Sequence, residues 1–183
     1  SEVAPEAGME RAWTRFILLF LGIFAALTMI VVAAAFVLDP YDTGRPGWIN
    51  KAGVRPQGPR TAAASRARDP AFNAAIFGNS HAQLLSPERL NALTGLSFVS
   101  LIAPATLHRE QLVLLDWFTR HRTAPPKAII LGIDGNWCTG DPNQPNDKPF
   151  PFWLYERSLL SYLRGLVRYD MLEEAPRRLA YLF

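Results

Sequence analysis

A run of 23 residues without a charged side chain, Phe16 to Leu38, constrains the fold of this chain more than any other feature. A helix of this length spans about 35 Å, which exceeds the roughly 30 Å hydrocarbon core of a bilayer. The alternative is a cleaved signal peptide, because small residues at 33–35 would suit cleavage, but the apolar part of a signal peptide is only about 7–15 residues long. The run therefore predicts an uncleaved transmembrane helix at 16–38, which follows an N-terminal tail at 1–15.

Basic residues stand on both sides of this run, so the positive-inside rule does not decide its orientation. Arg11 and Arg15 precede the run, and Arg45, Lys51 and Arg55 follow it. A single N-terminal anchor in front of a domain usually leaves its short tail in the cytosol. We expect that arrangement here, with the bilayer as one partner of the chain.

The remaining composition excludes several classes of function. The net charge is only +3, and the densest basic patch, Lys51 to Arg68, has no interleaved aromatic residues. It is typical of a solvated connector over anionic headgroups, and we expect no nucleic-acid binding. Cys138 is the single cysteine, so no internal disulfide forms. No His, Cys or Asp residues stand at metal-ligand spacing, and we expect neither a metal nor another cofactor.

Beyond a connector at 39–70, the segment 71–183 has the pattern of an α/β domain. Apolar runs at 72–77, 96–102 and 127–133 predict buried strands, and helical patterns at 87–93 and 107–122 separate them. Strands alternating with helices of this length predict a mainly parallel sheet covered on both faces, a three-layer flavodoxin-like arrangement. A further helix is expected at 152–171, and Pro176 is expected to interrupt the C-terminal segment beyond it. Three strands are few for such a sheet, so we expect an incomplete or reduced domain.

The turn after the first strand carries the candidate chemistry. The strand stops at Gly78, and Ser80 follows two residues later. Ser86 is expected to cap the next helix, and Gly95 to end it in the left-handed conformation. Strand, Gly-x-Ser and helix together place a serine hydroxyl at the carboxyl end of a parallel sheet, where ligands of open α/β sheets bind. A turn serine without chemistry is the alternative interpretation.

The segment after the third strand, Asp134 to Cys138, ends at the same edge of the sheet. Together with the Gly78-Asn79-Ser80 turn and the βαβ units, it resembles the SGNH (GDSL-like) hydrolase superfamily over roughly residues 72–138. The resemblance is strongest to the membrane-anchored, cell-envelope branch. In that branch one N-terminal helix holds an extracytoplasmic domain that transfers or removes acyl groups on surface polymers.

The resemblance implies that Ser80 is the nucleophile, that its own N–H is one oxyanion donor, and that the side chain of Asn136 is another. The chain departs from the family at three places. The segment 100–104 lacks the family's glycine donor, Asn79 replaces the common Asp, and the C-terminal Asp-x-x-His motif is absent. The last departure matters most, because a serine hydroxyl is a weak nucleophile until a base takes its proton.

Two local histidines are candidates for that base. His108 starts the second helix at the carboxyl edge of the sheet and is a weak candidate. His81 adjoins Ser80, but neighbours in a turn rarely direct their side chains at each other. Asp134 and Asn136 have an alternative role as caps of the loop after the third strand, as short polar side chains often do.

Two functions are expected from these features. The first is a serine-dependent acyl-ester hydrolase or acyltransferase that acts on a cell-envelope polysaccharide or lipid, anchored by a single pass in the inner membrane with its domain in the periplasm. The second is a non-catalytic SGNH-like subunit of a membrane-protein complex, which the absent Asp-x-x-His motif and the absent glycine favour.

Overall fold

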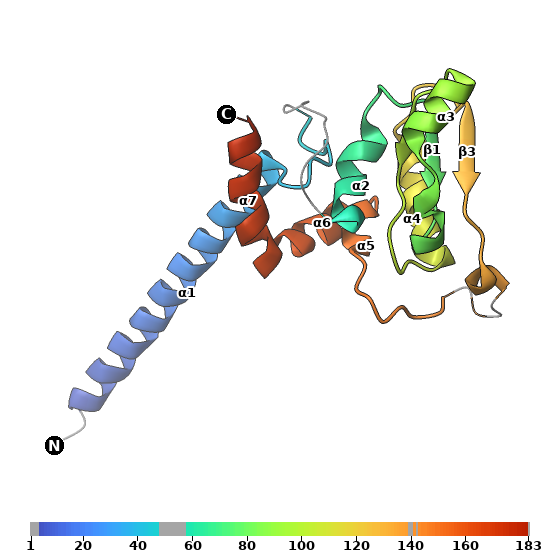
Figure 1. The fold of residues 1–183 in the computed structure, drawn as a ribbon. Helices are drawn as coiled ribbons and strands as arrows, with labels where there is room; N and C mark the ends of the chain where they lie inside the picture. Colours follow the sequence, from blue (N-terminus) through green and yellow to red (C-terminus); the bar gives the residue numbers. More distant parts are fainter. Residues whose placement is uncertain (1–3, 48–57, 139–140, 142, 183) are drawn as a thin grey trace.

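The computed structural model describes residues 4–47, 58–138, 141 and 143–182. A long helix leads into a domain with a small sheet (Figure 1). In chain order the elements are α1 (Ala4–Leu38), α2 (Pro59–Arg68), β1 (Ala74–Phe77), the 3-10 helix η1 (Ser80–Leu84), α3 (Pro87–Thr94), β2 (Phe98–Ser100), α4 (His108–Arg120), β3 (Ala128–Leu131), the 3-10 helix η2 (Gly135–Cys138), α5 (Phe152–Tyr155), α6 (Leu159–Leu166) and α7 (Tyr169–Leu182).

Helix α1 confirms the expected apolar helix and extends it towards the N-terminus. Among the described residues it is the one helix long and apolar enough to cross a membrane. Only its C-terminal end enters the domain, where Ala35 is 3% exposed and the ring of Phe36 packs edge-on against Tyr162. Figure 1 shows the N-terminal half of the helix projecting away from the other elements. The helix is therefore joined to the domain at its last turns.

The sheet has three parallel strands in the order β2-β1-β3, which confirms an α/β fold with a parallel sheet. The central strand β1 is completely buried, and its alternate side chains face opposite sides. Ala75 and Phe77 join a core with α2 and α4, whereas Ala74 and Ile76 join a second core with α3. The nearly continuous apolar sequence of β1 follows from this two-sided burial.

Strand β3 is less covered than its neighbour. It lies at one edge of the sheet, and its four residues are intermediate or exposed rather than buried. The side chain of Ile129 is 43% exposed, and Ile133 just beyond the strand is 67% exposed. Parallel sheets are usually covered on both faces, so this edge leaves apolar surface uncovered.

The ends of α3 are as the sequence predicts. The hydroxyl of Ser86 accepts a hydrogen bond from the backbone N–H of Arg89 at 3.2 Å, and Pro87 occupies the first helical position. Gly95 ends the helix with φ +69°. A left-handed residue at this place is most easily a glycine, because it has no Cβ to clash.

The single helix predicted at 152–171 is wrong, because the structure divides this segment among α5, α6 and the start of α7. Arginines from other elements bind the carbonyl groups that the break releases. Arg120 donates to the carbonyl of Tyr155, and Arg45 donates to that of Glu156. Ser158 then caps α6 by accepting from the N–H of Ser161 at 3.2 Å. These partners replace the helical hydrogen bonds that are lost at the break.

The expectation that Pro176 interrupts the C-terminal segment is also wrong, since α7 continues through it. A proline inside a helix removes one backbone hydrogen bond and crowds the preceding turn. Two residues later, however, the fully buried side chain of Arg178 bonds the carbonyl of Leu38 and the carboxylate of Asp42. Packing of α7 against the end of α1 outweighs the local cost of the proline.

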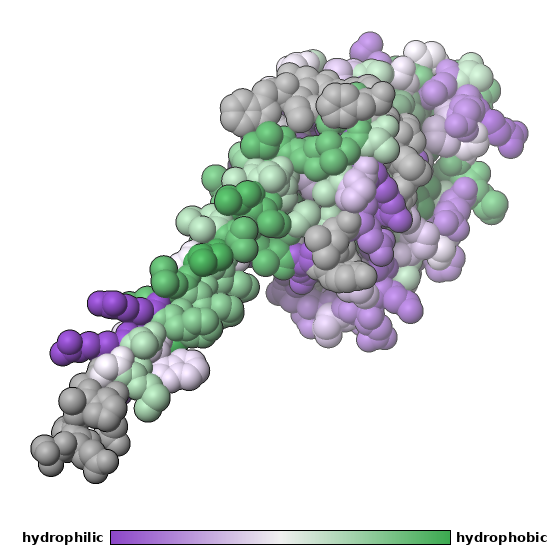
Figure 2. Space-filling view, turned by 90° about the vertical axis from the view of Figure 1, so that its left-hand side faces the viewer, coloured by the Kyte–Doolittle hydropathy of each residue, from purple (hydrophilic) through white to green (hydrophobic). Residues whose placement is uncertain are grey.

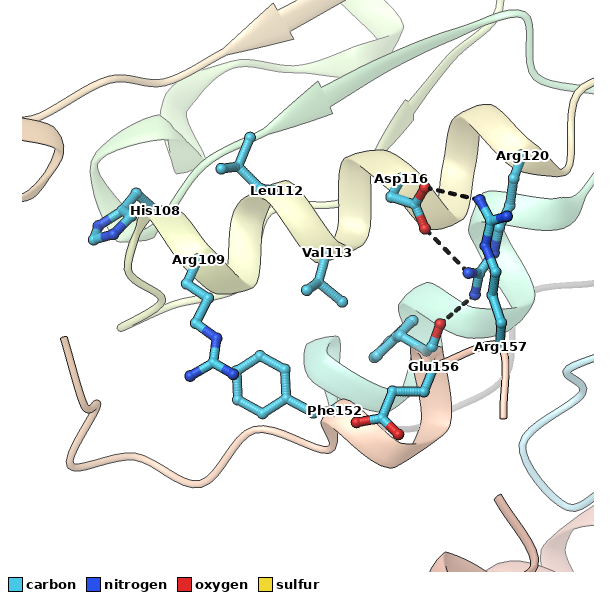
Figure 3. Close-up of a pocket in the computed structure, with 10 residues that line it drawn as sticks. His108, Arg109, Leu112, Val113, Asp116, Arg120, Phe152, Glu156 and Arg157 are labelled. Carbon is cyan, nitrogen blue, oxygen red and sulfur yellow. Dashed lines mark hydrogen bonds and ion pairs between the residues drawn. The ribbon is translucent and has the colours of Figure 1, made fainter. Parts of the chain in front are cut away.

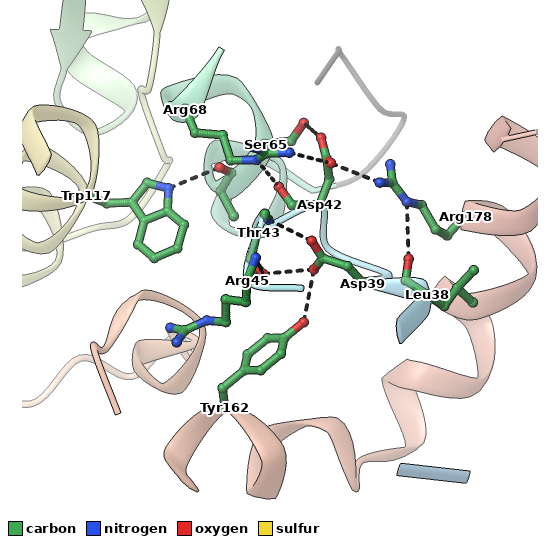
Figure 4. A network of polar contacts seen from close by, with 12 residues as sticks. Leu38, Asp39, Asp42, Thr43, Arg45, Ser65, Arg68, Trp117, Tyr162 and Arg178 are labelled. Carbon is green, nitrogen blue, oxygen red and sulfur yellow. Dashed lines mark hydrogen bonds and ion pairs between the residues drawn. The ribbon is translucent and has the colours of Figure 1, made fainter. Parts of the chain in front are cut away.

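Two buried carboxylates connect α1 to the domain (Figure 4). Asp39 directly follows α1 and is completely buried. Its carboxylate accepts hydrogen bonds from the hydroxyl of Thr43 at 2.8 Å, the N–H of Gly44 at 2.7 Å and the hydroxyl of Tyr162 at 3.0 Å. Burial raises the pKa of Tyr162, and the adjacent Asp39 raises it further, so the phenol remains protonated and acts as the donor.

Asp42 is also completely buried and lies between two guanidinium groups. Arg68 of α2 and Arg178 of α7 each approach its Oδ1 at 2.9 Å, and the hydroxyl of Ser65 donates to its Oδ2 at 2.5 Å. One carboxylate therefore holds together α2, α7 and the segment that follows α1. A buried charge is tolerated only when such partners compensate for its lost hydration.

We expect Asp42→Asn to lower the free energy of unfolding by about 3–5 kcal/mol, because it leaves two arginines without their shared counter-charge. Urea unfolding in a mild detergent, followed by circular dichroism, measures this loss. The control is Glu173→Gln, which removes an exposed carboxylate 3.5 Å from Arg177 and should cost about 0–1 kcal/mol. Equal losses in the two variants would show that the Asp42 network does not stabilise the fold.

Candidate functional site

The candidate site lies where the carboxyl ends of β1 and β3 meet. From β1 the chain passes to β2 on one side, and then returns to place β3 on the other side of β1. The order therefore reverses between β1 and β3, and ligands of open α/β sheets bind at such a switch point. Phe77 pairs with Leu131 in the parallel register, so the turns after the two strands begin at the same level.

Two glycines allow η1 to pack closely against this edge. A Cβ on Gly78 would lie 2.6 Å from the Cβ of Ala82, and one on Gly132 would lie 3.1 Å from the same atom. Ala82 is itself buried in the core beside α3. The glycines are therefore required by close approach, and they fix η1, which starts at Ser80, against the ends of β1 and β3.

Asp134 is the centre of a polar cluster at this edge. Its carboxylate accepts a hydrogen bond from the side-chain amide of Asn79, which comes from the turn after β1. It also accepts from the backbone N–H of Asn136 at 3.0 Å and from its side-chain amide at 3.3 Å. The Nδ1 atom of His81 lies 3.4 Å from Asp134 Oδ2. Asp134 thus caps its own loop and also joins the two turns.

These donors stabilise the charged form of the carboxylate. The hydrogen bond from Asn79 is the main cause that holds the pKa of Asp134 below its usual value, and the contacts from Asn136 and His81 act in the same direction. Asp134 is therefore a fixed negative charge that orients the two asparagine amides.

Ser80 is exposed at the start of η1, between Asn79 and His81. Asn79 is buried, and its side-chain oxygen accepts the N–H of His81 at 3.0 Å, which fixes the turn around the serine. Within the described residues, the hydroxyl of Ser80 makes no hydrogen bond. The hydroxyl is therefore held at the switch point and is accessible to solvent.

The two histidines considered as bases occupy different positions. The ring of His81 faces Asp134, as expected for a side chain that diverges from its neighbour Ser80. His108 begins α4 and is 8% exposed, with its ring centroid 6.1 Å from that of Trp137 in η2. Neither ring forms a hydrogen bond with Ser80, so the part of the chain that the structure describes does not supply a base in contact with this serine.

The segment after β2, where the family has a glycine donor, continues the sheet. The N–H of Leu101 donates to Ile76, and that of Ala103 donates to Gly78 at 3.0 Å. The N–H of Ala103 is therefore already used. Ala105 has φ +54°, a strained conformation for a residue with a Cβ. The side chains of Arg60 and Asn146 both bind its carbonyl and support this conformation.

A groove of about 470 Å³ runs along the outer side of α4 and begins at His108 (Figure 3). Arg109 lies over the ring of Phe152 at 4.6 Å, and Leu112 and Val113 are further apolar parts of the wall. The other end is charged, where Asp116 pairs with Arg120 and with Arg157. Ligand pockets are usually lined by apolar side chains with a few polar groups, and this groove has that composition.

Sequence reasoning placed Ser80, Asp134 and Asn136 at one edge but did not identify the pairing of Asn79 with Asp134. The signal in the sequence is that each of these two polar residues stands two or three positions beyond a neighbouring parallel strand. The described residues include no group of three or more His, Cys, Asp or Glu side chains arranged for a metal ion. Cys138 is exposed at the end of η2.

No protein-family model, curated protein or solved structure matches this chain.

We expect Asn79→Ala to raise the pKa of Asp134, because it removes the main hydrogen bond to the carboxylate. Because the pKa of Asp134 is lower in the folded protein than in the unfolded chain, ionisation of this carboxyl stabilises the fold at pH values above the unfolded-state pKa of about 3.9. This stability is lost as the pH falls through the folded-state pKa. In both proteins this loss begins near the unfolded-state pKa, but in the variant it should be smaller and should be complete at a higher pH than in the parent. NMR titration of the Asp134 carboxyl carbon measures the change directly.

The matched control is Ser86→Ala, which removes the main hydrogen bond that lowers the pKa of Glu88. It should raise the pKa of Glu88 and leave that of Asp134 unchanged. An unchanged Asp134 titration in Asn79→Ala would contradict the assigned role of Asn79.

Proposed function

We propose that this protein is a membrane-anchored serine acyl-ester hydrolase or acyltransferase that acts on a cell-envelope polysaccharide or lipid. The observation that carries the proposal is the position of Ser80. Its hydroxyl is exposed at the carboxyl end of the central strand, at the switch point, in the turn whose Asn79 shares the carboxylate of Asp134 with Asn136. These features fit the resemblance of this turn to the SGNH hydrolases.

In the proposed reaction the Ser80 oxygen attacks the carbonyl carbon of an acyl ester, the bond from that carbon to the alcohol oxygen breaks, and the departing alcohol takes the proton that the serine hydroxyl gives up. The negative charge on the carbonyl oxygen is stabilised by the N–H of Ser80 and by the side chain of Asn136. An asparagine amide has two hydrogens, and Asp134 uses one of those of Asn136, which leaves the other available. Water or a polymer hydroxyl then takes the acyl group.

The connection between α1 and the domain supports an uncleaved anchor. The carbonyl of Leu38, the last residue of the helix, accepts from buried Arg178 at 3.4 Å, and Ala35 is part of the domain core. Cleavage after residue 35 would remove the buried side chain of Ala35 from this core. We therefore propose a single-pass anchor in the inner membrane, with the short N-terminal tail in the cytosol and the domain in the periplasm.

We expect a fluorophosphonate probe to modify the natively expressed protein once, with loss of fluoride, and Ser80→Ala to abolish the adduct in intact-mass spectra. Ser86→Ala is the control, because it removes a nearby serine that caps α3. Asn136→Ala should keep the adduct but slow its formation by about 10²–10³-fold, since it removes one oxyanion donor. An adduct that persists in Ser80→Ala would contradict the proposal.

The second candidate is a non-catalytic subunit of a membrane-protein complex. The uncovered edge at β3 favours it, because Ile129 and Ile133 expose apolar surface that a partner protein would bury. The absence of a base in contact with Ser80, within the described residues, fits this candidate as well. Under this interpretation Ser80 is a turn residue and no probe adduct forms.

We expect a complex that uses this edge to dissociate in Ile133→Asp, because a charge would then be buried against the partner. Size-exclusion chromatography of protein solubilised in mild detergent measures the change in mass. Leu93→Asp is the control, since this side chain is 82% exposed on α3 and lies outside the strand. A parent protein that runs alone as a monomer would contradict the subunit candidate.

A further inference from the structure

The second half of α1 shares a groove of about 570 Å³ with the end of α6 and the start of α7. From α1 the groove is lined by Phe24, Leu27, Thr28, Val31 and Val32. From the other side it is lined by Leu166, Val167, Arg168 and Met171, which form the elbow between α6 and α7. Apart from Thr28 and Arg168, these residues are apolar, so the groove suits a hydrocarbon ligand.

The position of the groove along α1 gives its depth in a bilayer. Counted from Phe16, a hydrocarbon core of roughly 30 Å corresponds to about 20 residues of helix. The residues that α1 contributes to the groove, 24–32, all fall within this length. If α1 crosses the membrane, the elbow beside these residues lies at hydrocarbon depth.

The exposed side chains of the elbow agree with this depth. Val167 directly follows α6 and is 60% exposed, which is costly for an apolar side chain in water. The next residue, Arg168, is also exposed, and so is Arg164 in the last turn of α6. Long arginine side chains reach from an apolar surface to the phosphate layer and are attracted to anionic headgroups.

In the space-filling view, the apolar surface of α1 continues onto the domain where the helix enters it (Figure 2). We propose that the α6–α7 elbow is a second membrane-embedded element, and that lipid acyl chains fill the groove between it and α1. The domain is then held at a fixed height and orientation on the bilayer, rather than on a single flexible helix. This inference rests on the membrane anchor of the proposed function.

The test is the accessibility of a nitroxide label to oxygen, which concentrates in the bilayer, and to a water-soluble nickel chelate. The labels are placed at Val167→Cys, at Phe20→Cys within α1, and at Leu93→Cys on α3. All three side chains are more than half exposed, and each variant carries Cys138→Ser to remove the exposed native cysteine. The protein is reconstituted in vesicles of phosphatidylcholine and phosphatidylglycerol.

We expect the labels at residues 167 and 20 to have similar accessibilities, with more collisions with oxygen than with the nickel chelate. The label at residue 93 should collide mainly with the nickel chelate. A label at 167 that behaves like the label at 93 overturns the inference and leaves the anchor intact. A label at 167 that neither reagent reaches also overturns it, because a protein surface then covers the elbow. A label at 20 that collides with nickel overturns the anchor itself.

Discussion

The burial of two carboxylates just beyond α1 is the constraint on which the rest of the structure depends. Asp39 and Asp42 are completely buried, and each must find partners to offset its lost hydration. Asp42 finds them in Arg68 and Arg178, and Asp39 finds one in Tyr162. These contacts gather α2, α6 and α7 around the end of α1. The orientation of the domain relative to its apolar helix is therefore set by ion pairs and hydrogen bonds, with apolar packing around them.

A second polar cluster lies at the carboxyl edge of the sheet and is centred on the carboxylate of Asp134. Here too a charged group is held by hydrogen-bond partners, but it lies near the surface. Its partners are neutral amides and a histidine. It therefore remains charged and orients the side-chain amides of Asn79 and Asn136 at the edge of the sheet where Ser80 lies. The first cluster gives rigidity to the connection between helix and domain, whereas the second joins the turns that follow β1 and β3. The proposed chemistry needs both, since an anchored enzyme must present its nucleophile at a defined distance from the membrane.

The predictable parts of the fold are those with strong local patterns. The apolar runs enclose β1, β2 and β3, and Ser86 and Gly95 mark the ends of α3 as expected. The wrong predictions concern the C-terminal third of the chain. The single helix expected at 152–171 is divided among α5, α6 and the start of α7, and Pro176 lies within α7. Each error has a long-range cause. Arg45 and Arg120 bind carbonyls at the break after α5, and Arg178 holds α7 in place. Periodicity in the sequence cannot predict such partners, because they come from distant segments of the chain.

The sequence by itself determined the apolar helix, the parallel strands and the edge at which Ser80, Asp134 and Asn136 gather, because these depend on composition and on short-range periodicity. The tertiary structure decided which polar groups pair. Asn79 meets Asp134 only because the register of β1 and β3 and the close packing at Gly78 and Gly132 align their turns. Asp42 meets Arg178 across 136 positions of the chain. A buried charge is stable only beside a partner that offsets its lost hydration, and the tertiary structure decides which residue is that partner.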